Sequence, residues 1–450
     1  MSVTELIGIT VSESQSGTVL ATFDRLGIVA GASDTPPSDM SGIRAKGYTA
    51  NSDGLAAVGE EWGDASGFYA AFAKAISQEQ KPAMIYGIKR DAPVAVQNTI
   101  TFATAIATGH TINAVVNGTT ITVPFNTDAA TTYGDFETAI EAVEGIATAT
   151  VAGDVITVVA TSEWELSISC SASGVGAPTV TVAVSVPGRT IADDIADAIA
   201  EDDTNQWYGI STVDSSKGLV LSAAAFIETT EKLYFARTDE AATKTTGGTT
   251  SLGYVLNNLK YRRTVLFWHH TPNEYIDTAA LAMYLGNDPG TLQLFGRSLV
   301  GVTPSPTSQI SAAEVTVLKL RSVNTYRKFG PTGMITQGRR VDGQVVEATR
   351  DTDSVVNDLR QTFLTFLSQT KKPSYDGPGF AAIQAQGDGV ARRSVTNNIL
   401  RSDLPVVFTI PQLDDIDPAD YAAQLVPNCN LSGTLKKGVN KIDINLNVQL

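Results

Sequence analysis

The sequence predicts a multidomain protein with α/β and α+β parts: an open α/β core, a mostly β inserted domain and a C-terminal α+β domain. Three observations predict this class. Strands and helices alternate over residues 189–313, which is the pattern of an open α/β sheet. The composition changes sharply at residue 93 and changes back after residue 188. At 450 residues, the chain is too long for one ordinary hydrophobic core.

The first 92 residues are expected to form an extended arm and the first part of the core. Within the arm, residues 1–22, every second side chain is apolar, which predicts a strand with Ile7, Ile9 and Val11 on one face. The first part of the core, residues 23–92, predicts two short strands and one amphipathic helix, at residues 23–30, 83–88 and 66–80.

Residues 93–188 are predicted to be an inserted β-rich domain. This stretch contains no lysine or arginine and eight acidic residues, so its surface is acidic. Segments rich in Thr and Val predict short strands, and Asn117-Gly118 between two of them is a strong hairpin signal. One helix is expected within the domain, at residues 134–143. Because the sequence on both sides reads as one α/β unit, the domain is placed at a loop tip, where an insertion destabilises a fold least.

Residues 189–313 are expected to be the second part of the α/β core. Four helices are predicted, at residues 191–200, 218–228, 251–259 and 277–286. Four strands are predicted between and after them, at residues 207–213, 232–238, 263–270 and 292–301. Strands that are separated by helices imply an open sheet.

The C-terminal domain, residues 314–438, is predicted to contain two helices. One covers residues 311–330 and ends at a Gly-Pro stop. The other covers residues 354–370, with Asp351 and Asp353 before its N-terminus and Lys371 and Lys372 after its C-terminus, as the helix dipole favours. A last segment, residues 439–450, alternates cleanly and predicts a strand whose apolar face is formed by Ile442, Ile444, Leu446 and Val448.

Composition and motifs argue against several classes of function. The net charge of −15 and the pI near 4.7 give no basic surface for nucleic acid. The chain has two cysteines far apart and shows no phosphate-binding loop, nucleophile elbow or zinc-protease motif, so no cofactor, metal or catalytic residue is expected. No apolar run approaches the roughly 20 residues of a membrane span. The N-terminus lacks the features of a signal peptide, so synthesis in a reducing cytoplasm is expected.

One grouping keeps an enzymatic alternative open. His269, His270 and Glu274 follow a predicted strand, where sites of α/β enzymes often lie, so a metal-dependent α/β hydrolase is the alternative hypothesis. Adjacent histidines on a strand point to opposite faces and do not bind one ion without a break in the strand. The plainer interpretation is a polar strand end.

The two terminal strand patterns point to assembly, and two interpretations stay open. Both strands can close the protein's own sheet, or they can leave the subunit and add to the sheets of neighbouring copies. Periodicity does not choose between these interpretations. Residues 314–450 carry a net charge of +2, so this part of the chain could face an acidic partner.

Several segments together resemble one known family. They are residues 54–90, with a Val-Gly turn, a helix and a strand, the sheet strands at 207–212 and 261–270, the Asn-x-Tyr motif at 324–326, the Gly- and Asp-rich stretch 338–353, and the Lys-Lys-Pro loop at 371–379. In order and spacing these segments resemble the tail sheath proteins of contractile bacteriophages (myoviruses). Two departures are Ser354, where the family often has Trp, and residues 430–433, where a small-residue motif of the family is not recognisable.

The resemblance implies a structural protein of the virion tail that is made in the cytoplasm of the host bacterium. It implies a C-terminal domain of sheath type, and hexameric rings that stack helically around a tail tube and contract to drive genome ejection. The residues at 7, 9 and 11 and at 442, 444, 446 and 448 would form linking strands between subunits. Lys371 and Lys372 would face the tube, and the baseplate and tail terminator proteins would be further partners. Neither direct nucleic-acid binding nor membrane insertion is implied, and the domain at 93–188 would decorate the outside.

Overall fold

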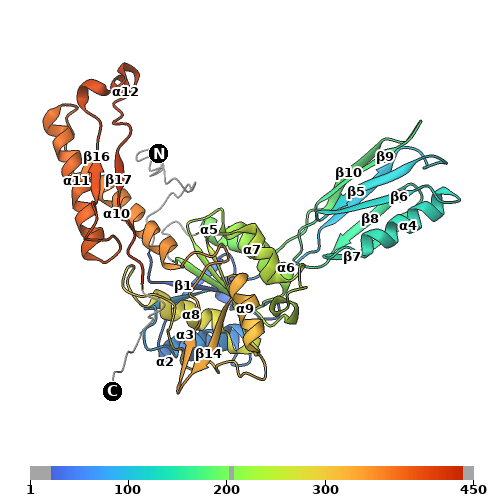
Figure 1. The fold of residues 1–450 in the computed structure, drawn as a ribbon, viewed down its shortest axis with the longest axis horizontal. Helices are drawn as coiled ribbons and strands as arrows, with labels where there is room; N and C mark the ends of the chain where they lie inside the picture. The colour runs from blue at the N-terminus through green and yellow to red at the C-terminus, as the bar shows by residue number, and fades with distance from the viewer. Residues whose placement is uncertain (1–21, 202–206, 439–450) are drawn as a thin grey trace, which may run out of the picture.

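The computed structural model describes residues 22–201 and 207–438. The described chain has three visible parts: a compact centre, a β-rich module that projects from one side, and a helical hairpin that projects from another (Figure 1). The predicted linking-strand residues lie outside the described residues; they are Ile7, Ile9, Val11, Ile442, Ile444, Leu446 and Val448.

The centre is built on one eight-stranded sheet with the order β15-β14-β13-β12-β11-β1-β3-β2. Its strands are β1 (Leu26–Val29), β2 (Ala45–Thr49), β3 (Met84–Ile88), β11 (Gly209–Thr212), β12 (Leu233–Thr238), β13 (Thr264–Trp268), β14 (Asn324–Phe329) and β15 (Thr332–Ile335). The six inner strands pair in parallel, and the edge strands β2 and β15 pair antiparallel with their neighbours. β11, β12 and β13 are buried at every position, because helices cover both faces of the sheet.

Seven helices form the two layers that cover this sheet. One apolar core contains side chains of α2 (Ser52–Trp62), α3 (Gly67–Ile76) and α8 (Ile276–Leu285). The other contains side chains of α5 (Ile191–Glu201), α6 (Lys217–Ile227), α7 (Leu252–Leu259) and α9 (Ala312–Leu320). Short 3-10 turns lie between elements, at η1 (Ser38–Met40), η2 (Ala241–Lys244) and η3 (Pro272–Glu274). The mixed α/β class predicted from the sequence is confirmed.

The projecting β-rich module has a core of its own. Its elements are β4 (Gln97–Phe102), β5 (Thr111–Val116), β6 (Thr119–Pro124), α4 (Ala129–Glu141), β7 (Ile146–Ala152), β8 (Val155–Ala160), β9 (Ile168–Ser173) and β10 (Val180–Val186). They form two antiparallel sheets, β10-β4-β8-β7 and β6-β5-β9, with α4 packed against β7 and β6. Asn117 and Gly118 both have positive φ, 47° and 80°, as a tight hairpin turn between β5 and β6 requires.

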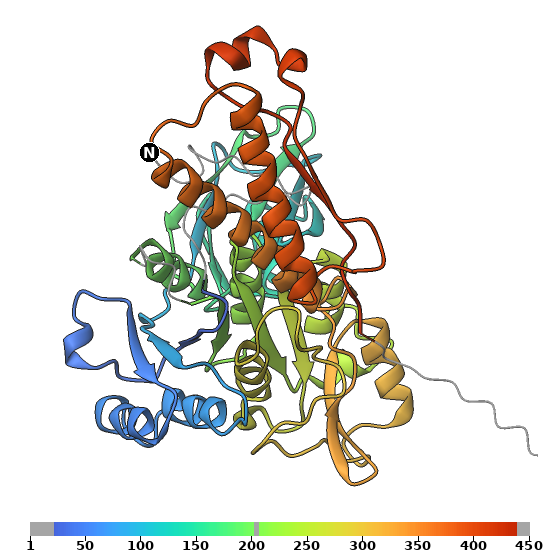
Figure 2. The same ribbon diagram turned by 90° about the vertical axis from the view of Figure 1, so that its left-hand side faces the viewer.

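The helical hairpin consists of α10 (Glu347–Gln369) and α11 (Gly377–Thr396), and a two-stranded sheet lies on it. That sheet pairs β16 (Val407–Thr409) with β17 (Asn430–Ser432); η4 (Leu413–Asp415) and α12 (Pro418–Ala422) lie between the two strands. α10 begins in the compact centre and runs outward, and α11 returns beside it (Figure 2).

Two predicted elements are wrong. The helix predicted at 311–330 ends at Leu320, because Ser322 adopts a positive φ of 56° and the following residues enter the sheet as β14. The strand predicted at 292–301 is irregular, since Gly296 and Gly301 have φ of 76° and 73°, conformations that break a strand.

The helix predicted at 354–370 begins seven residues earlier, at Glu347. Asp351 and Asp353 therefore lie inside α10, and they do not stabilise its N-terminus as predicted. Several elements have no counterpart in the prediction, namely α2, α11, β2, β4, β7, β15, β16 and β17.

Candidate functional site

The side chains of the grouping that suggested a metal site make structural contacts, including His270, whose Nδ1 lies 3.1 Å from the hydroxyl of Ser305. β13 ends at Trp268, so the rings of His269 and His270 lie 4.6 Å apart, and the predicted opposite orientation is wrong. The buried His269 ring has its two nitrogens 2.9 Å from the carbonyl oxygen of Thr271 and 2.8 Å from that of Thr303.

Glu274 completes this set of contacts. It accepts hydrogen bonds from the backbone N–H and the hydroxyl of Thr303, at 2.6 and 2.8 Å. Burial alone raises the pKa of this carboxyl, but the hydrogen bonds from Thr303 and the nearby charges of His269 and Lys74 together hold the pKa of Glu274 below its ordinary value. These side chains fasten the segment around Thr303 to the end of β13. Over residues 22–201 and 207–438, no three His, Cys, Asp or Glu side chains are grouped as a metal ion would need.

The root of the helical hairpin is fixed to the centre by a buried arginine. Arg350, 1% exposed, lies in the first turns of α10. Its guanidinium donates to the carbonyl oxygens of Tyr284 and Phe23, both at 2.8 Å, and of Asn287 at 2.6 Å. One side chain thereby connects α10, the end of α8 and the start of the described chain.

Two ion pairs extend this attachment along α10. Arg263 binds both carboxylate oxygens of Asp353, at 2.8 and 2.9 Å, and the hydroxyl of Tyr208 donates to the same carboxylate. About two turns further on, Arg360 binds both oxygens of Glu231, at 2.7 and 2.8 Å. Bidentate pairs of this kind fix direction as well as distance. The first four turns of α10 are therefore held to the centre as one body.

The distal end of the hairpin carries the two lysines that the sequence singled out. Lys371 and Lys372 are exposed and follow α10 directly. The segment around α12 lies at the same end, since Tyr375 donates to the carbonyl oxygen of Leu425 at 2.7 Å and its ring lies 5.0 Å from that of Tyr421. That segment is acidic, with Asp414, Asp415, Asp417 and Asp420. The distal end thus presents both signs of charge.

The two-stranded sheet has one covered face and one open face. Phe408, 3% exposed, packs with Leu359 and Val390 of the hairpin. Val407 on the other face is 45% exposed. Within the described part of the chain, β16 and β17 pair only with each other, so each has an unpaired edge. A sheet of two three-residue strands is marginal by itself and gains stability from added strands.

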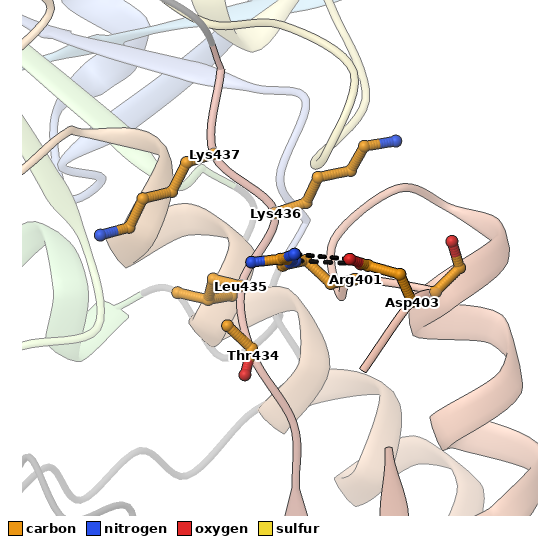
Figure 3. A pocket seen from close by; sticks show the side chains of 7 residues that line it. Arg401, Asp403, Thr434, Leu435, Lys436 and Lys437 are labelled. Carbon is orange, nitrogen blue, oxygen red and sulfur yellow. Dashed lines mark hydrogen bonds and ion pairs between the residues drawn. The ribbon is translucent and has the colours of Figure 1, made fainter. Parts of the chain in front are cut away.

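The pairing continues past β17 and forms a basic pocket. Leu435 pairs with Leu400, and Arg401 donates its backbone N–H to Thr434 at 2.9 Å. The pocket of about 370 Å³ at this place is lined by Arg401, Asp403, Lys436 and Lys437 with three neutral neighbours (Figure 3). Arg401 pairs with Asp403, so the two lysines leave the pocket with a net positive charge.

The architecture is similar to that of several solved structures. No protein-family model matches the chain, and no curated protein matches it. The helical sheath of the anti-feeding prophage in its contracted state is similar, with a TM-score of 0.51 and 10% identity over 98% of both chains. The contracted sheath complex of the extracellular contractile injection system PVC has a TM-score of 0.50 and 9% identity, over 98% of this chain and 96% of that one. The sheath tail protein from Desulfitobacterium hafniense is 12% identical over 89% and 93%, with a TM-score of 0.45.

This chain has the fold of a contractile tail sheath protein. The alignments with the two contracted sheaths each cover 98% of this chain. No helix in the parts of this sheath fold that the structure describes has the length and apolarity to span a membrane.

Sequence reasoning missed the open sheet and its pocket. β16 and β17 are three residues each, too short for periodicity to detect, and their partners come from 21 or more residues away. One signal was present, the pair Lys436-Lys437 directly before the predicted terminal strand. Lys371 and Lys372 were singled out, and they lie at the opposite, distal end of the hairpin.

Proposed function

We propose that this chain is the structural subunit of a contractile phage tail sheath and has no enzymatic role. In this proposal it polymerises as stacked hexameric rings around the tail tube, in the virion tail, and contracts to drive the tube through the host envelope. The observation that carries the proposal is the similarity over 98% of the chain to two sheath subunits.

Subunits would be linked by the two terminal segments. Residues 1–21 and 439–450 would leave their own subunit and add strands to the β16–β17 sheets of neighbours. The unpaired edges of this sheet support the idea, since they offer backbone donors and acceptors to an incoming strand. Links of this kind survive when subunits rotate against each other, because a strand can pivot at its root.

Contraction would then be a change in the joints between rigid subunits. The bonds of Arg350 and the ion pairs of α10 hold the hairpin to the centre, so the hairpin and the central sheet would move together. Contacts that repeat without closing generate helical tubes. A lattice with two packings of the same rigid unit can switch between them cooperatively.

Other partners belong to the same proposal. The tail tube would lie against the distal end of the hairpin, with Lys371 and Lys372 facing it. Baseplate and tail terminator proteins would bind the two ends of the stack. The subunit would be made in the cytoplasm of the host bacterium and would bind no nucleic acid directly.

Electron microscopy of the purified full-length protein tests this function. Negative staining should show tubes of uniform diameter. Replacing the four apolar residues of the C-terminal strand pattern with aspartate should abolish long tubes and leave a folded subunit; these are Ile442, Ile444, Leu446 and Val448. A control with Asn445→Ser and Asn447→Ser changes the other face of the same segment and should assemble normally. Normal long tubes from the aspartate variant would refute strand-linked assembly.

A further inference from the structure

We propose that the tip of the β14–β15 hairpin docks on the acidic outer face of α2 in a second copy of this chain. The hairpin tip, residues 327–334, carries two basic side chains and an exposed aromatic ring. The outer face of α2 carries carboxylates beside a small side chain. The proposal rests on the proposed sheath function, because it adds an interface between subunits of one tube that involves neither terminal segment.

The hairpin tip presents charge and apolar surface that its own subunit does not use. Arg327 is half-buried and Lys328 is exposed. Within residues 22–201 and 207–438, the side chains of Arg327 and Lys328 form no ion pair and no hydrogen bond. Phe329 is 49% exposed, whereas the other phenylalanines of the chain are buried or half-buried. An exposed aromatic ring beside an arginine is the typical composition of an interface anchor.

The outer face of α2 has the opposite charge. Asp53, Ala56 and Glu60 are exposed, and their spacing along the helix places them on one face. Asp64, also exposed, follows the helix, and a Cβ built at Gly59 would lie 2.2 Å from its Oδ1, so this carboxylate lies against the last turn of α2. In the described part of the chain, none of these three carboxylates forms an ion pair. The face is therefore free to bind a positive partner.

The spacing of the two surfaces agrees. Arg327 and Phe329 share one face of β14 and lie about 7 Å apart, as two residues in a strand do. Glu60 and Ala56 lie about 6 Å apart along the axis of α2, as four residues in a helix do. With Arg327 paired to Glu60, the ring of Phe329 would cover Ala56, whose small side chain leaves room for it. Lys328 projects from the other face of the strand and adds to the positive potential of the tip.

The two surfaces lie too far apart to meet within one subunit. β15 and β2 are the two edge strands of the eight-stranded sheet, and α2 packs on β2. Neighbouring strands lie about 4.8 Å apart, so these edges are about 34 Å apart. Figure 2 shows the blue helices and the orange hairpin on opposite sides of the centre. A contact between opposite edges is head-to-tail, and contacts of this kind generate rings and helical stacks.

Charge reversal in the full-length protein tests the contact. Arg327→Glu with Lys328→Glu makes the hairpin tip acidic, and Glu60→Lys with Asp64→Lys makes the α2 face basic. Each variant alone should form tubes about tenfold more slowly than the wild type in light scattering, because like charges then meet. Lysines at the C-terminal end of α2 suit the helix dipole. Circular dichroism spectra should therefore show that both variants are folded.

A mixture of the two variants shows whether the contact joins different copies. In a one-to-one mixture, the acidic hairpin of one variant meets the basic α2 of the other, and the two unchanged surfaces also face each other. The mixture should assemble at a rate within about twofold of the wild-type rate. Lys260→Glu with Arg392→Glu is the control, since it changes the net charge as the hairpin variant does, at two exposed sites elsewhere. This control should assemble at the wild-type rate by itself.

A cross-link locates the contact. Thr332 lies opposite Phe329 in the hairpin, so Thr332→Cys and Ala56→Cys place one thiol on each surface without changing a charge. The two variants, each with Cys429→Ser to remove the exposed native thiol, are mixed during assembly and treated with a short bis-maleimide. A covalent dimer should form only in the mixture. Tubes without this dimer would overturn the proposal, and chains with Cys429→Ser alone give the background.

The outcomes separate this contact from the function it rests on. If both charge-reversal variants assemble at the wild-type rate while the aspartate variant of the C-terminal strand does not assemble, the hairpin contact is wrong and the sheath function stands. If the wild type forms no tubes at any concentration, the sheath function fails and this contact fails with it. Folded reversal variants that stay blocked when they are mixed also refute the contact.

Discussion

Buried arginines hold the joints of this molecule at the scale of single residues. Arg350 and Arg360 lie along α10, and Arg90 lies where the β-rich module meets the centre; each is at most 7% exposed. Each guanidinium binds several oxygens at once, which suits it to a junction where several segments meet. Such groups stabilise only while their partners are present, since a buried oxygen without a donor is costly.

Arg350 provides the sharpest test of this view. Arg350→Met keeps much of the side-chain volume and removes the donors to three carbonyl oxygens. We expect the free energy of unfolding to fall by about 3 kcal/mol or more. Urea unfolding followed by tryptophan fluorescence measures the change. Arg392→Met, at an exposed site on α11, is the control and should change it by less than about 0.5 kcal/mol. Equal effects of the two changes would contradict the anchoring role.

Glu347 and Asp351 beside Arg350 predict a pH dependence. Burial raises the pKa of Glu347 to about 7 and that of Asp351 to about 6, from ordinary values of 4.5 and 3.8. At a pH between the ordinary and the raised pKa of each group, the folded state therefore binds more protons than the unfolded chain. The stability that the two groups contribute is fully present below about pH 4 and is lost as the pH rises through 7.

Glu347→Gln should remove most of this dependence. The wild type should lose up to about 3 kcal/mol from Glu347 between pH 5 and pH 8, and the variant should be the more stable protein at pH 8. Urea midpoints at pH 5, 6.5 and 8 check the sign. Glu165→Gln, at an exposed carboxylate of the β-rich module, serves as control and should leave the pH profile unchanged. A variant that is less stable than the wild type at pH 8 would overturn the assignment.

At the scale of elements, the contact between α11 and the small sheet depends on one glycine. A Cβ built at Gly387 would lie 2.1 Å from Cδ1 of Phe408, so any larger residue displaces β16 from the hairpin. At Gly389, on the same helix, the nearest atom to such a Cβ is the end of the Arg393 side chain at 3.4 Å. Gly387 and Gly389 both lie within α11, but only Gly387 is packed tightly against another element.

Gly387→Ala and Gly389→Ala should therefore have opposite effects. Overpacking against Phe408 should lower stability by about 1–3 kcal/mol and reduce tube formation, because the acceptor sheet is displaced. Gly389→Ala should raise stability by about 0.5–1 kcal/mol through helix propensity and leave assembly intact. Thermal unfolding measures the change in stability, and negative-stain images show whether tubes form. If Gly387→Ala formed normal tubes, the β16–β17 sheet in its present position would not be needed for assembly.

Elements with strong local periodicity were predictable from the sequence, and others were not. α5 to α8 and β11 to β13 follow the predicted positions within a few residues, since each is short, apolar and bounded by turn residues. α11 escaped prediction because its four glycines and many small residues give little helical signal. Residues 324–329 continue a helix-like pattern locally, and pairing with β13 and β15 makes them a strand.

The candidate site, too, could be predicted from the sequence only in part. The terminal strand patterns are visible in the sequence, but the surface proposed to receive them is assembled from segments more than 20 residues apart. The exposed side of β16 and the pocket lysines lie on one surface only because residues 399–401 pair with residues 434–436. Sequence patterns indicated the arms, and tertiary structure was needed to indicate their acceptor.

At the scale of the whole molecule, the β-rich module is attached to the centre by side chains as well as by its two ends. Its ends are bound to each other, since Val94 and Arg189 exchange backbone hydrogen bonds at 3.0 and 2.8 Å. One of these side chains is Glu163, which binds the buried Arg90 and accepts a hydrogen bond from the backbone N–H of Ile191 at 2.8 Å. Lys217 of α6 also pairs with Glu144 of the module and lies over the ring of Trp164. Glu163 has a positive φ of 70°, a conformation kept only where the surroundings demand it. The module is thereby fixed in direction relative to the centre.

The paired ends predict that the module can be removed without unfolding the centre. Because Val94 and Arg189 already form a narrow antiparallel pair, an Asn-Gly turn in place of residues 95–188 closes the chain without strain. We expect the shortened protein to fold and to form tubes of smaller outer diameter in negative stain. Its unfolding midpoint should fall, since Arg90 loses Glu163 and keeps only Asp214. Glu163→Gln in the full chain isolates that loss, and it should lower stability while the tube diameter stays unchanged. A shortened chain that is folded yet forms no tubes would show that the module carries contacts between subunits and is not an outer decoration.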